Sequence, residues 1–538
     1  MSGNTITEST PVLIVGGSLV GLSAAVFLAW HDIPVVLVEK HAGSSLHPRA
    51  IGYTTRTLEL FRATGIAVPE SLQGISAPRR ARVESLAGTW FEEYPWTPGG
   101  EQPDIEYSPA HATAIPQDRL EPILRQRATD LGADLRPRTE LIGFTQDDDG
   151  VSAILRRRDD GVEYRLRAQY SVAADGADSP IREALGIARS GEGLLSTQRS
   201  ILFTAPIDHY LERGVVQFEV EQPDFKGFLT TYSDGRWVLM LGDDLDRDVE
   251  EQRELVRKAI GRNDIPIDLI TTGRWRLAAL IADRFAMGRV FLAGDAAHQL
   301  PPNRGGFGAN TGIEDVHNLA WKLAAVLRGQ AAPALLDTYD AERRAIANLR
   351  HEQIFARADY KAYLKTPESE APILDDIAIE LGQLYRSSAV IGAGSDLPPA
   401  QRPDQWSGQP GTRAPHLRIQ LGDKEISTLD LFGHRWVLLS ADERWSAAAR
   451  AAERVGVPTA FVHLGADVKP LESNAFEDTY GIEATGATLV RPDGYIAWRS
   501  AAAPLDPVAA LTDVLRRVTG LESATGRSDA DVLPVSRG

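Results

Sequence analysis

The stretch Pro11-Val12-Leu13-Ile14-Val15-Gly16-Gly17-Ser18-Leu19-Val20-Gly21 decides the fold class of this chain. Its apolar run ends in two glycines, and an apolar helical pattern follows from Ser18 to about His31. A second apolar run, Val35-Val36-Leu37-Val38-Glu39, comes after that pattern. Strand, glycine turn, helix and strand form a βαβ unit, which predicts a parallel sheet in an α/β fold.

The glycine turn has the composition of a dinucleotide cradle. Gly16 and Gly21 allow a tight turn and close helix–strand packing, and Ser18 takes the middle glycine position. The helix N-terminus offers N–H groups to phosphates, and Glu39 can accept hydrogen bonds from ribose hydroxyls. The residues expected to hold the dinucleotide here are Gly16, Ser18, Leu19, Val20, Gly21, Glu39 and Lys40. By itself the turn does not distinguish FAD from NAD, and an ordinary glycine-rich turn is the alternative.

Two distant strand ends extend this pattern. Val172-Ala173-Ala174-Asp175-Gly176 ends in Asp-Gly, and Val290-Phe291-Leu292-Ala293-Gly294-Asp295 ends in Gly-Asp. The second strand continues into a loop of prolines and glycines from Pro301 to Gly312. Strand-end carboxylates suit sugar hydroxyls, and glycines let the backbone pass close to a flat ring. A helix beginning near Asn310 would turn its positive end toward that ring.

In these three segments the chain resembles the single-component aromatic hydroxylases of the para-hydroxybenzoate hydroxylase group, which are FAD-dependent monooxygenases. The resemblance implies that Asp295 bonds the ribityl chain of FAD, and that Asp175 and Arg182 serve near the pyrophosphate. It also implies that Arg49 and Gln117 touch the flavin. Further cofactor contacts are expected at Gly294, Pro302, Gly305, Gly308, Asn310 and Thr311.

The resemblance also implies a reaction. NADPH, or NADH, would reduce FAD, and reduced FAD would take up oxygen as a C4a-hydroperoxide that hydroxylates an aromatic carbon. Baeyer–Villiger oxygenation, epoxidation and oxidative rearrangement remain open on the same scaffold. An oxygen-independent flavin reductase and a non-catalytic flavin-binding protein are further alternatives. Arg49, His298 and Pro301 are candidates for a catalytic role, a structural role is favoured for His298, and no general base is assigned.

Residues 191–274 are rich in predicted strands and are expected to bind a polycyclic aromatic substrate. Their clearest hairpin joins Phe228–Tyr232 to Arg236–Leu241 around Ser233-Asp234-Gly235. The candidates for the pocket wall are Phe228, Tyr232, Trp237 and Met240. Because alternate side chains of a strand face opposite ways, core packing is the alternative for each.

The C-terminal part resembles the thioredoxin-like tail of the larger group members, such as phenol hydroxylases and hydroxylases of anthracycline-type polyketides. Without cysteines this tail cannot act as a redox domain, so packing or subunit contact, including a homodimer, is expected. The expected domains are a discontinuous FAD-binding domain (1–190 and 275–365, with substrate-domain strands inserted near 72–112), the β-rich substrate domain (191–274), a linker (366–412), the thioredoxin-like domain (413–520) and a flexible tail (521–538).

The composition narrows the classes of function. The 538-residue chain carries a formal net charge of −17, which disfavours nucleic acid and anionic membranes as partners. Its lack of cysteine excludes disulfides and thiolate metal ligands, and the sequence has no His/Asp/Glu cluster with metal-ligand spacing. The sequence shows neither a bilayer-spanning apolar stretch nor a secretory signal pattern, so a cytoplasmic location is expected.

Overall fold

The computed structural model describes residues 7–47, 49–69, 79–95, 105–302, 306–357, 370–472 and 475–521. The chain divides into two compact units. The first comprises Met1–Ala324, Tyr339–Gln383 and Pro399–Gln405, and the second comprises Ala325–Thr338, Leu384–Pro398 and Trp406–Gly538. Within the described residues, no helix combines the length and apolarity needed to cross a membrane.

The predicted βαβ unit is present and builds the first sheet. Strand β1 (Thr7–Val15) pairs in parallel with β2 (Val35–Glu39) and with β10 (Glu163–Ala173), and α1 (Leu19–Trp30) connects β1 to β2. The sheet order is β16-β17-β10-β1-β2-β7, and the hairpin β8-β9 extends β10. Val35 to Val38 are all buried, as expected for a parallel strand covered on both faces. The remaining strands are β7 (Asp134–Pro137), β8 (Thr139–Asp147), β9 (Gly150–Arg157), β16 (Ala286–Met287) and β17 (Val290–Leu292).

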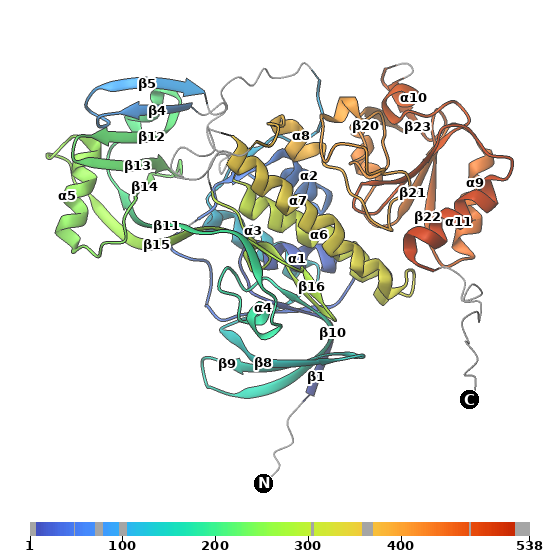
Figure 1. The fold of residues 1–538 in the computed structure, drawn as a ribbon, viewed down its shortest axis with the longest axis horizontal. Coiled ribbons are helices and arrows are strands. Elements are labelled where there is room, and N and C mark those ends of the chain that lie inside the picture. The colour runs from blue at the N-terminus through green and yellow to red at the C-terminus, as the bar shows by residue number, and fades with distance from the viewer. Residues whose placement is uncertain are drawn as a thin grey trace, which may run out of the picture. The chain divides into compact units, whose positions relative to one another are not determined.

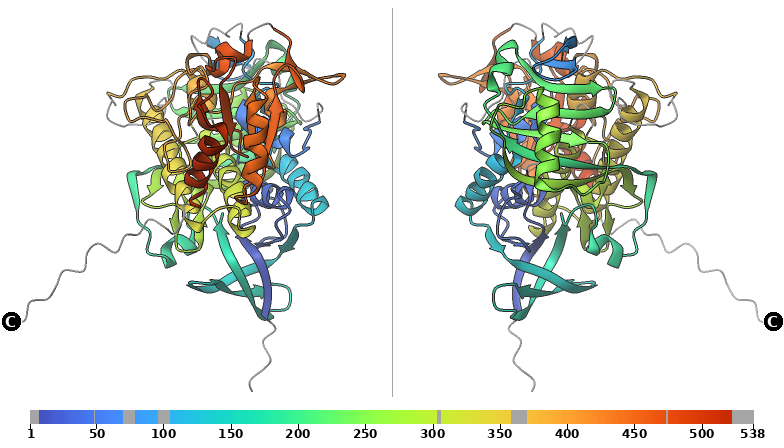
Figure 2. Two further views of the ribbon diagram at one scale, coloured as in Figure 1. Left: turned by 90° about the vertical axis from the view of Figure 1, so that its right-hand side faces the viewer. Right: turned by 90° about the vertical axis from the view of Figure 1, so that its left-hand side faces the viewer.

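A second sheet of the first unit has the order β18-β15-β11-β14-β13-β12-β4-β5. Its strands are β4 (Arg79–Val83), β5 (Trp90–Pro95), β11 (Arg189–Thr204), β12 (Val215–Gln222), β13 (Phe225–Thr231), β14 (Arg236–Leu241), β15 (Asp268–Ala282) and β18 (His298–Gln299). The long strands β11 and β15 run beside each other along most of their length (Figure 1). Helix α5 (Val249–Ile260) crosses one face of this sheet (Figure 2, right), where Val256 and Ile260 share a core with Phe218.

The helix after the Pro/Gly loop starts earlier than the sequence predicts. Helix α6 begins at Phe307 rather than near Asn310 to Gly312. Asn310 Nδ2 donates a 2.8 Å hydrogen bond to the carbonyl of Gly306, so this side chain closes the first turn instead of preceding it. The other helices of the first unit are α2 (Thr55–Ala63), α3 (Gln117–Asp130), α4 (Pro180–Ala184), α6 (Phe307–Leu327), α7 (Asp337–Ala356) and α8 (Asp376–Leu381).

The expected linker is partly folded onto the first unit. Helix α8 lies within it, and Ile379 is fully buried in a cluster with Phe307 and Ile354. Burial of these apolar side chains stabilises the segment against the first unit, so it does not behave as a simple spacer. The expected flexible tail lies outside the described residues from position 522 onward, and so does Gly305.

The second unit contains a four-stranded sheet of order β22-β21-β24-β25 and a three-stranded sheet of order β20-β19-β23. Helices α9 and α11 pack together, and α9 also contacts β22. Val437, Leu439 and Val490 lie in its core. Strand β21 pairs in parallel with β22 and antiparallel with β24, and the predicted α/β fold class is confirmed. The elements are β19 (Arg418–Leu421), β20 (Lys424–Ser427), β21 (Trp436–Ser440), α9 (Arg444–Glu453), β22 (Thr459–His463), β23 (Val468–Pro470), α10 (Ala475–Tyr480), β24 (Ala487–Val490), β25 (Ile496–Ser500) and α11 (Pro507–Thr519).

Candidate active site

One cavity of about 2470 Å³ in the first unit brings the three sequence motifs together. Both large sheets and helix α8 contribute to its wall. The predicted cofactor residues that line it are Gly16, Ser18, Leu19, Val20, Glu39, Lys40, Arg49, Gln117, Asp175, Asp295, Pro302 and Gly308. Gly21, Gly294, Asn310 and Thr311 lie behind this wall and take part in packing.

The glycine turn is shaped by close backbone contacts. Gly16 has a φ of +108°, and a Cβ there would overlap the carbonyl of Ala174 at the end of β10. The Glu39 carboxylate accepts hydrogen bonds from the backbone N–H groups of Gly17 (2.6 Å) and His41 (2.7 Å). Glu39 therefore ties the glycine turn to the segment that follows β2. A carboxylate has about four acceptor positions, so Glu39 keeps capacity for a ribose hydroxyl.

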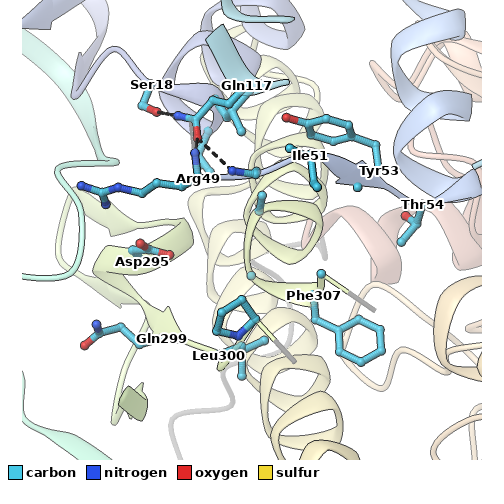
Figure 3. Close-up of a pocket in the computed structure, with 18 of the residues that line it drawn as sticks. Ser18, Arg49, Ile51, Tyr53, Thr54, Gln117, Asp295, Gln299, Leu300 and Phe307 are labelled. Atoms are coloured by element: carbon cyan, nitrogen blue, oxygen red, sulfur yellow. Dashed lines mark hydrogen bonds between the residues drawn. The ribbon is translucent and has the colours of Figure 1, made fainter. Parts of the chain in front are cut away.

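A network of polar side chains joins this turn to the segment that carries Arg49 (Figure 3). Ser18 Oγ donates to Glu121 Oε1 at 2.7 Å, and Gln117 Nε2 donates to the same oxygen at 2.7 Å. Gln117 Oε1 in turn accepts from the backbone N–H groups of Arg49 (3.2 Å) and Ala50 (3.3 Å). Gln117 thus holds two parts of the cavity wall in register, a role that its position at the start of α3 does not reveal in the sequence.

Arg182 links the segment that follows β10, with Asp175-Gly176, to the segment that follows β17, with Gly294-Asp295. This buried guanidinium donates to the carbonyl oxygens of Ala177 (3.1 Å) and Ala296 (3.0 Å). Asp175 Oδ2 accepts from the N–H of Ile181 at 3.2 Å, whereas Asp175 Oδ1 is buried with no hydrogen-bond partner among the described residues. Burial raises the pKa of Asp175. An unsatisfied acceptor at this point is a group that a bound polar molecule would satisfy.

Asp295 faces the cavity, and Figure 3 shows the side chains of Asp295 and Arg49 on the same side of the cavity. The carboxylate is exposed to the cavity but is surrounded by protein beyond it. This desolvation raises the pKa of Asp295 above its usual range, and the fields of His298 and Arg49 oppose the shift. Asp295 is therefore an acceptor that opens into the cavity and can accept a hydrogen bond from a hydroxyl group there.

His298 faces the core and not the cavity. Its ring is fully buried, and Nε2 lies 2.7 Å from Asp315 Oδ2. Asp315 also accepts from Arg343 Nε at 2.8 Å. Burial alone would raise the pKa of Asp315, but His298 and Arg343 outweigh it and leave that pKa below its usual value. The geometry gives His298 a positioning role behind Gly294, in line with the structural role that the sequence favours, and His298 does not line the cavity. Pro301 is buried behind the wall as well, while its neighbour Pro302 lines the cavity.

The four candidate substrate residues do not line the cavity. Trp237 lies in the opposite core, and its indole N–H donates to Asp208 Oδ1 at 2.8 Å. Tyr232 and Met240 pack with Ile51 on the cavity side, but beneath the lining. Phe228 is paired with Met240 across the hairpin and is also absent from the lining. The hairpin lines the cavity instead through its small polar residues Thr230, Thr231 and Ser233, because its large apolar side chains are used in packing.

Sequence reasoning missed several residues of the wall. Glu380 and Leu381 of α8 line the cavity, although they lie in the expected linker. Tyr53 also lines it, and its buried hydroxyl has no hydrogen-bond partner among the described residues (Figure 3). Behind the wall, buried Ser200 on β11 bonds His47 Nε2 at 2.8 Å, two residues before Arg49 in the chain. None of these residues belongs to a periodic or glycine-rich pattern, so no local signal marks them.

The comparisons with known proteins agree with this geometry. Residues 9–353 match the family described as FAD binding domain, and residues 407–521 match the family described as aromatic-ring hydroxylase, C-terminal. The chain therefore belongs to the family of FAD-dependent aromatic-ring hydroxylases. It is a flavin-dependent monooxygenase with FAD as cofactor and NAD(P)H as co-substrate.

Relatives and solved structures are similar over almost the whole chain. A 4-methyl-5-nitrocatechol 5-monooxygenase from Burkholderia sp. is 41% identical over 94% of this chain and 97% of the relative. Tetracenomycin A2 monooxygenase-dioxygenase from Streptomyces glaucescens is 37% identical over 96% of this chain and 98% of its own length. A solved complex of aklavinone-11 hydroxylase with FAD and aklavinone matches with a TM-score of 0.85 and 37% identity, over 95% of this chain and 99% of that chain.

Proposed function

We propose that this monooxygenase hydroxylates a polycyclic, polyketide-type phenol that binds in the cavity beside FAD. The observation that carries the proposal is the composition of the cavity end away from the glycine turn. Leu300 and Phe307 line it together with Leu374, Ile377 and Leu381. An apolar wall of this kind suits the flat face of a fused aromatic system.

The residues present fit FAD. Gly16 and the N-terminus of α1 would receive the pyrophosphate, Glu39 the adenosine ribose and Asp295 a ribityl hydroxyl. Pro302 and Gly308 would lie along the flavin ring, near the positive end of α6. When bound, FAD supplies the redox chemistry, the acceptance of hydride from NAD(P)H and the activation of oxygen. The protein side chains orient the substrate and exclude water from the cavity.

A second candidate is a monocyclic substrate. The 41% identical relative is named for a nitrocatechol, whereas the tetracenomycin and aklavinone relatives are named for fused-ring polyketides. Baeyer–Villiger oxygenation, epoxidation and oxidative rearrangement remain alternative outcomes on this scaffold.

We further infer that the cysteine-free second unit serves packing or subunit contact, with a homodimer as the expected assembly. Size-exclusion chromatography with light scattering measures the molar mass of the protein in solution and so tests whether it is a homodimer.

The purified protein tests the proposal directly. Its visible spectrum reports bound flavin, and oxygen uptake is then followed with NADPH or NADH in the presence of aklavinone, tetracenomycin A2 or 4-methyl-5-nitrocatechol. Uptake stimulated by a fused-ring phenol, with a product heavier by one oxygen and a new ring hydroxyl in the NMR spectrum, supports polycyclic hydroxylation. Stimulation by the nitrocatechol alone favours the monocyclic candidate. NADPH oxidation without oxygen uptake contradicts both.

A further inference from the structure

Glu380 is a carboxylate on the cavity wall that lies outside the three sequence motifs. It sits near the end of α8, and its neighbours in the wall include Thr55, Phe307 and Leu381. The side chain is only partly buried, because it borders the cavity. Glu380 thus lies on the cavity wall beside apolar side chains and the pair of Arg357 and Asp376, in the part of the cavity where a substrate ring is proposed to lie.

No arginine or lysine of the described residues forms an ion pair with Glu380. The positive charge of Arg350 favours the ionised form of Glu380, but its guanidinium is bound to Glu314 Oε1 at 2.7 Å and to Thr311 Oγ1 at 2.6 Å. Asp376, on the same helix, forms its ion pair with Arg357. The backbone N–H of Thr55, at the start of α2, also favours the charged form of Glu380 and so lowers its pKa, but this is weak compensation for a desolvated charge.

These surroundings make Glu380 a readily protonated group. Desolvation raises its pKa to about 7, Arg350 opposes the shift, and the carboxylates of Asp376 and Glu314 increase it. A carboxylate that titrates close to the working pH is suited to accept and release a proton during turnover. Asp175 and Asp295, whose pKa values are also raised by desolvation, lie among the strand-end motifs proposed for FAD.

We propose that Glu380 binds the hydroxyl of the substrate phenol and accepts its proton. The phenolic O–H bond breaks, an O–H bond forms on the Glu380 carboxylate, and the electron pair stays on the phenolate oxygen. The phenolate donates electron density into its ring, so the ring carbon attacks an electrophilic oxygen more readily. The proton then leaves Glu380 to water. This assignment rests on the proposed hydroxylation of a phenol.

The kinetic test compares the wild type with Glu380→Gln and Glu380→Asp, each loaded with FAD to the same visible absorbance. With aklavinone as the probe, wild-type kcat/KM should fall about tenfold per pH unit below pH 7. Glu380→Gln should lack this limb and remain at least tenfold below the wild type at pH 8, and Glu380→Asp should regain the limb. A Glu380→Gln enzyme that keeps the wild-type limb and lies within twofold of wild type at pH 8 overturns the proposal.

A binding test separates this assignment from the proposed function. Aklavinone is titrated into the oxidised enzyme without NADPH, at pH 6 and at pH 8. At pH 8 the wild type should bind it at least fivefold more tightly than Glu380→Gln, and at pH 6, where Glu380 is protonated, the difference should shrink. If the wild type and Glu380→Gln bind aklavinone with equal affinity at both pH values, Glu380 does not contact the phenol and the proposal is wrong. Wild-type enzyme that shows the pH-dependent difference but consumes no oxygen with any probe would overturn the hydroxylation while supporting the contact.

Discussion

Gly294 and Val20 lie in direct contact: a Cβ built on Gly294 would come within 2.8 Å of Val20 Cγ2. A Cβ on Gly312 would come within 2.6 Å of the same atom. The start of α1, the end of β17 and the first turns of α6 therefore meet at one point. Because these elements carry the first and third motifs, their glycines set how closely the motifs approach each other.

Gly294→Ala should destabilise the protein and reduce its FAD content. Gly294 has a φ of +60° and no room for a Cβ, so alanine adds backbone strain and a clash, together about 2–5 kcal/mol. Gly186→Ala is the matched control, since Gly186 has a φ of +67° with open space around it and should cost only about 1–2 kcal/mol. Denaturant unfolding and flavin absorbance measure both effects. Equal losses in the two variants would show that the contact with Val20 does not matter.

Asp295→Ala should weaken FAD binding about tenfold or more, because a ribityl hydroxyl would lose a charged hydrogen-bond acceptor. The dissociation constant is measured by titrating FAD into the apoprotein and following flavin fluorescence. Asp283→Ala is the control, since Asp283 is bonded to Ser190 Oγ at 2.7 Å and does not line the cavity. Full flavin occupancy and unchanged affinity in Asp295→Ala would contradict the proposed position of the cofactor.

Asp315→Asn should be destabilising, by about 1–3 kcal/mol, because buried Arg343 would keep only Glu314 as a charged partner and His298 would lose a charged one. The pKa of Asp315 is lowered, so its contribution is present above the unfolded value of 3.8 and is lost only as the pH falls below it. The deficit should therefore be constant between pH 5 and pH 8 in denaturant unfolding. The exposed pair of Arg262 and Asp264 gives a control, Asp264→Asn, whose unfolding midpoint should not change. A small deficit in Asp315→Asn would refute the importance of the cluster.

Ser200→Ala should cost about 1–3 kcal/mol, since the indole N–H of Trp275 loses its acceptor at 2.9 Å and His47 loses its partner at 2.8 Å. Trp275→Phe removes the donor, so the double variant should be less destabilised than the sum of the single variants. Thermal and denaturant unfolding at saturating FAD give the coupling energy. Strict additivity would mean that the bond between Trp275 and Ser200 contributes nothing.

Glu380→Gln should stabilise the protein at high pH. Because the pKa of Glu380 is raised to about 7 from an ordinary 4.5, the folded state holds more protons than the unfolded state between these values, and stability falls as the pH rises through them. Above pH 7 the variant should be more stable than the wild type by about 1–3 kcal/mol, and below pH 4.5 the difference should vanish. Asp376→Asn, which breaks the ion pair with Arg357, should instead destabilise at pH 8. Thermal melting curves of the wild type and Glu380→Gln between pH 4.5 and pH 8 test this prediction. A difference in stability that does not change with pH would contradict it.

Local patterns were enough to predict the architecture around the cofactor. The run from Pro11 to Gly21 specifies strand, turn and helix through residues that are neighbours in the chain, and Glu39 follows from the next strand. Gly294-Asp295 is recognisable for the same reason. The two-residue period of the hairpin around Ser233-Asp234-Gly235 also predicts strands, but it cannot say which face meets the cavity. For that reason Trp237 was expected in the wall and lies in the core.

The roles of some residues depend on partners far away in the chain, and only the tertiary structure reveals these roles. Ser200 and His47 are separated by 153 positions in the chain, and Gln117 reaches Arg49 across 68. The pKa of Glu380 depends on desolvation and on the charges of Arg350 and Glu314 from two other helices, and no sequence period marks these contacts. By itself the sequence determined the βαβ unit, the three motifs and the family, because short-range backbone preferences encode them. The tertiary structure decided the cavity wall, because burial and long-range contacts exist only after the chain has folded.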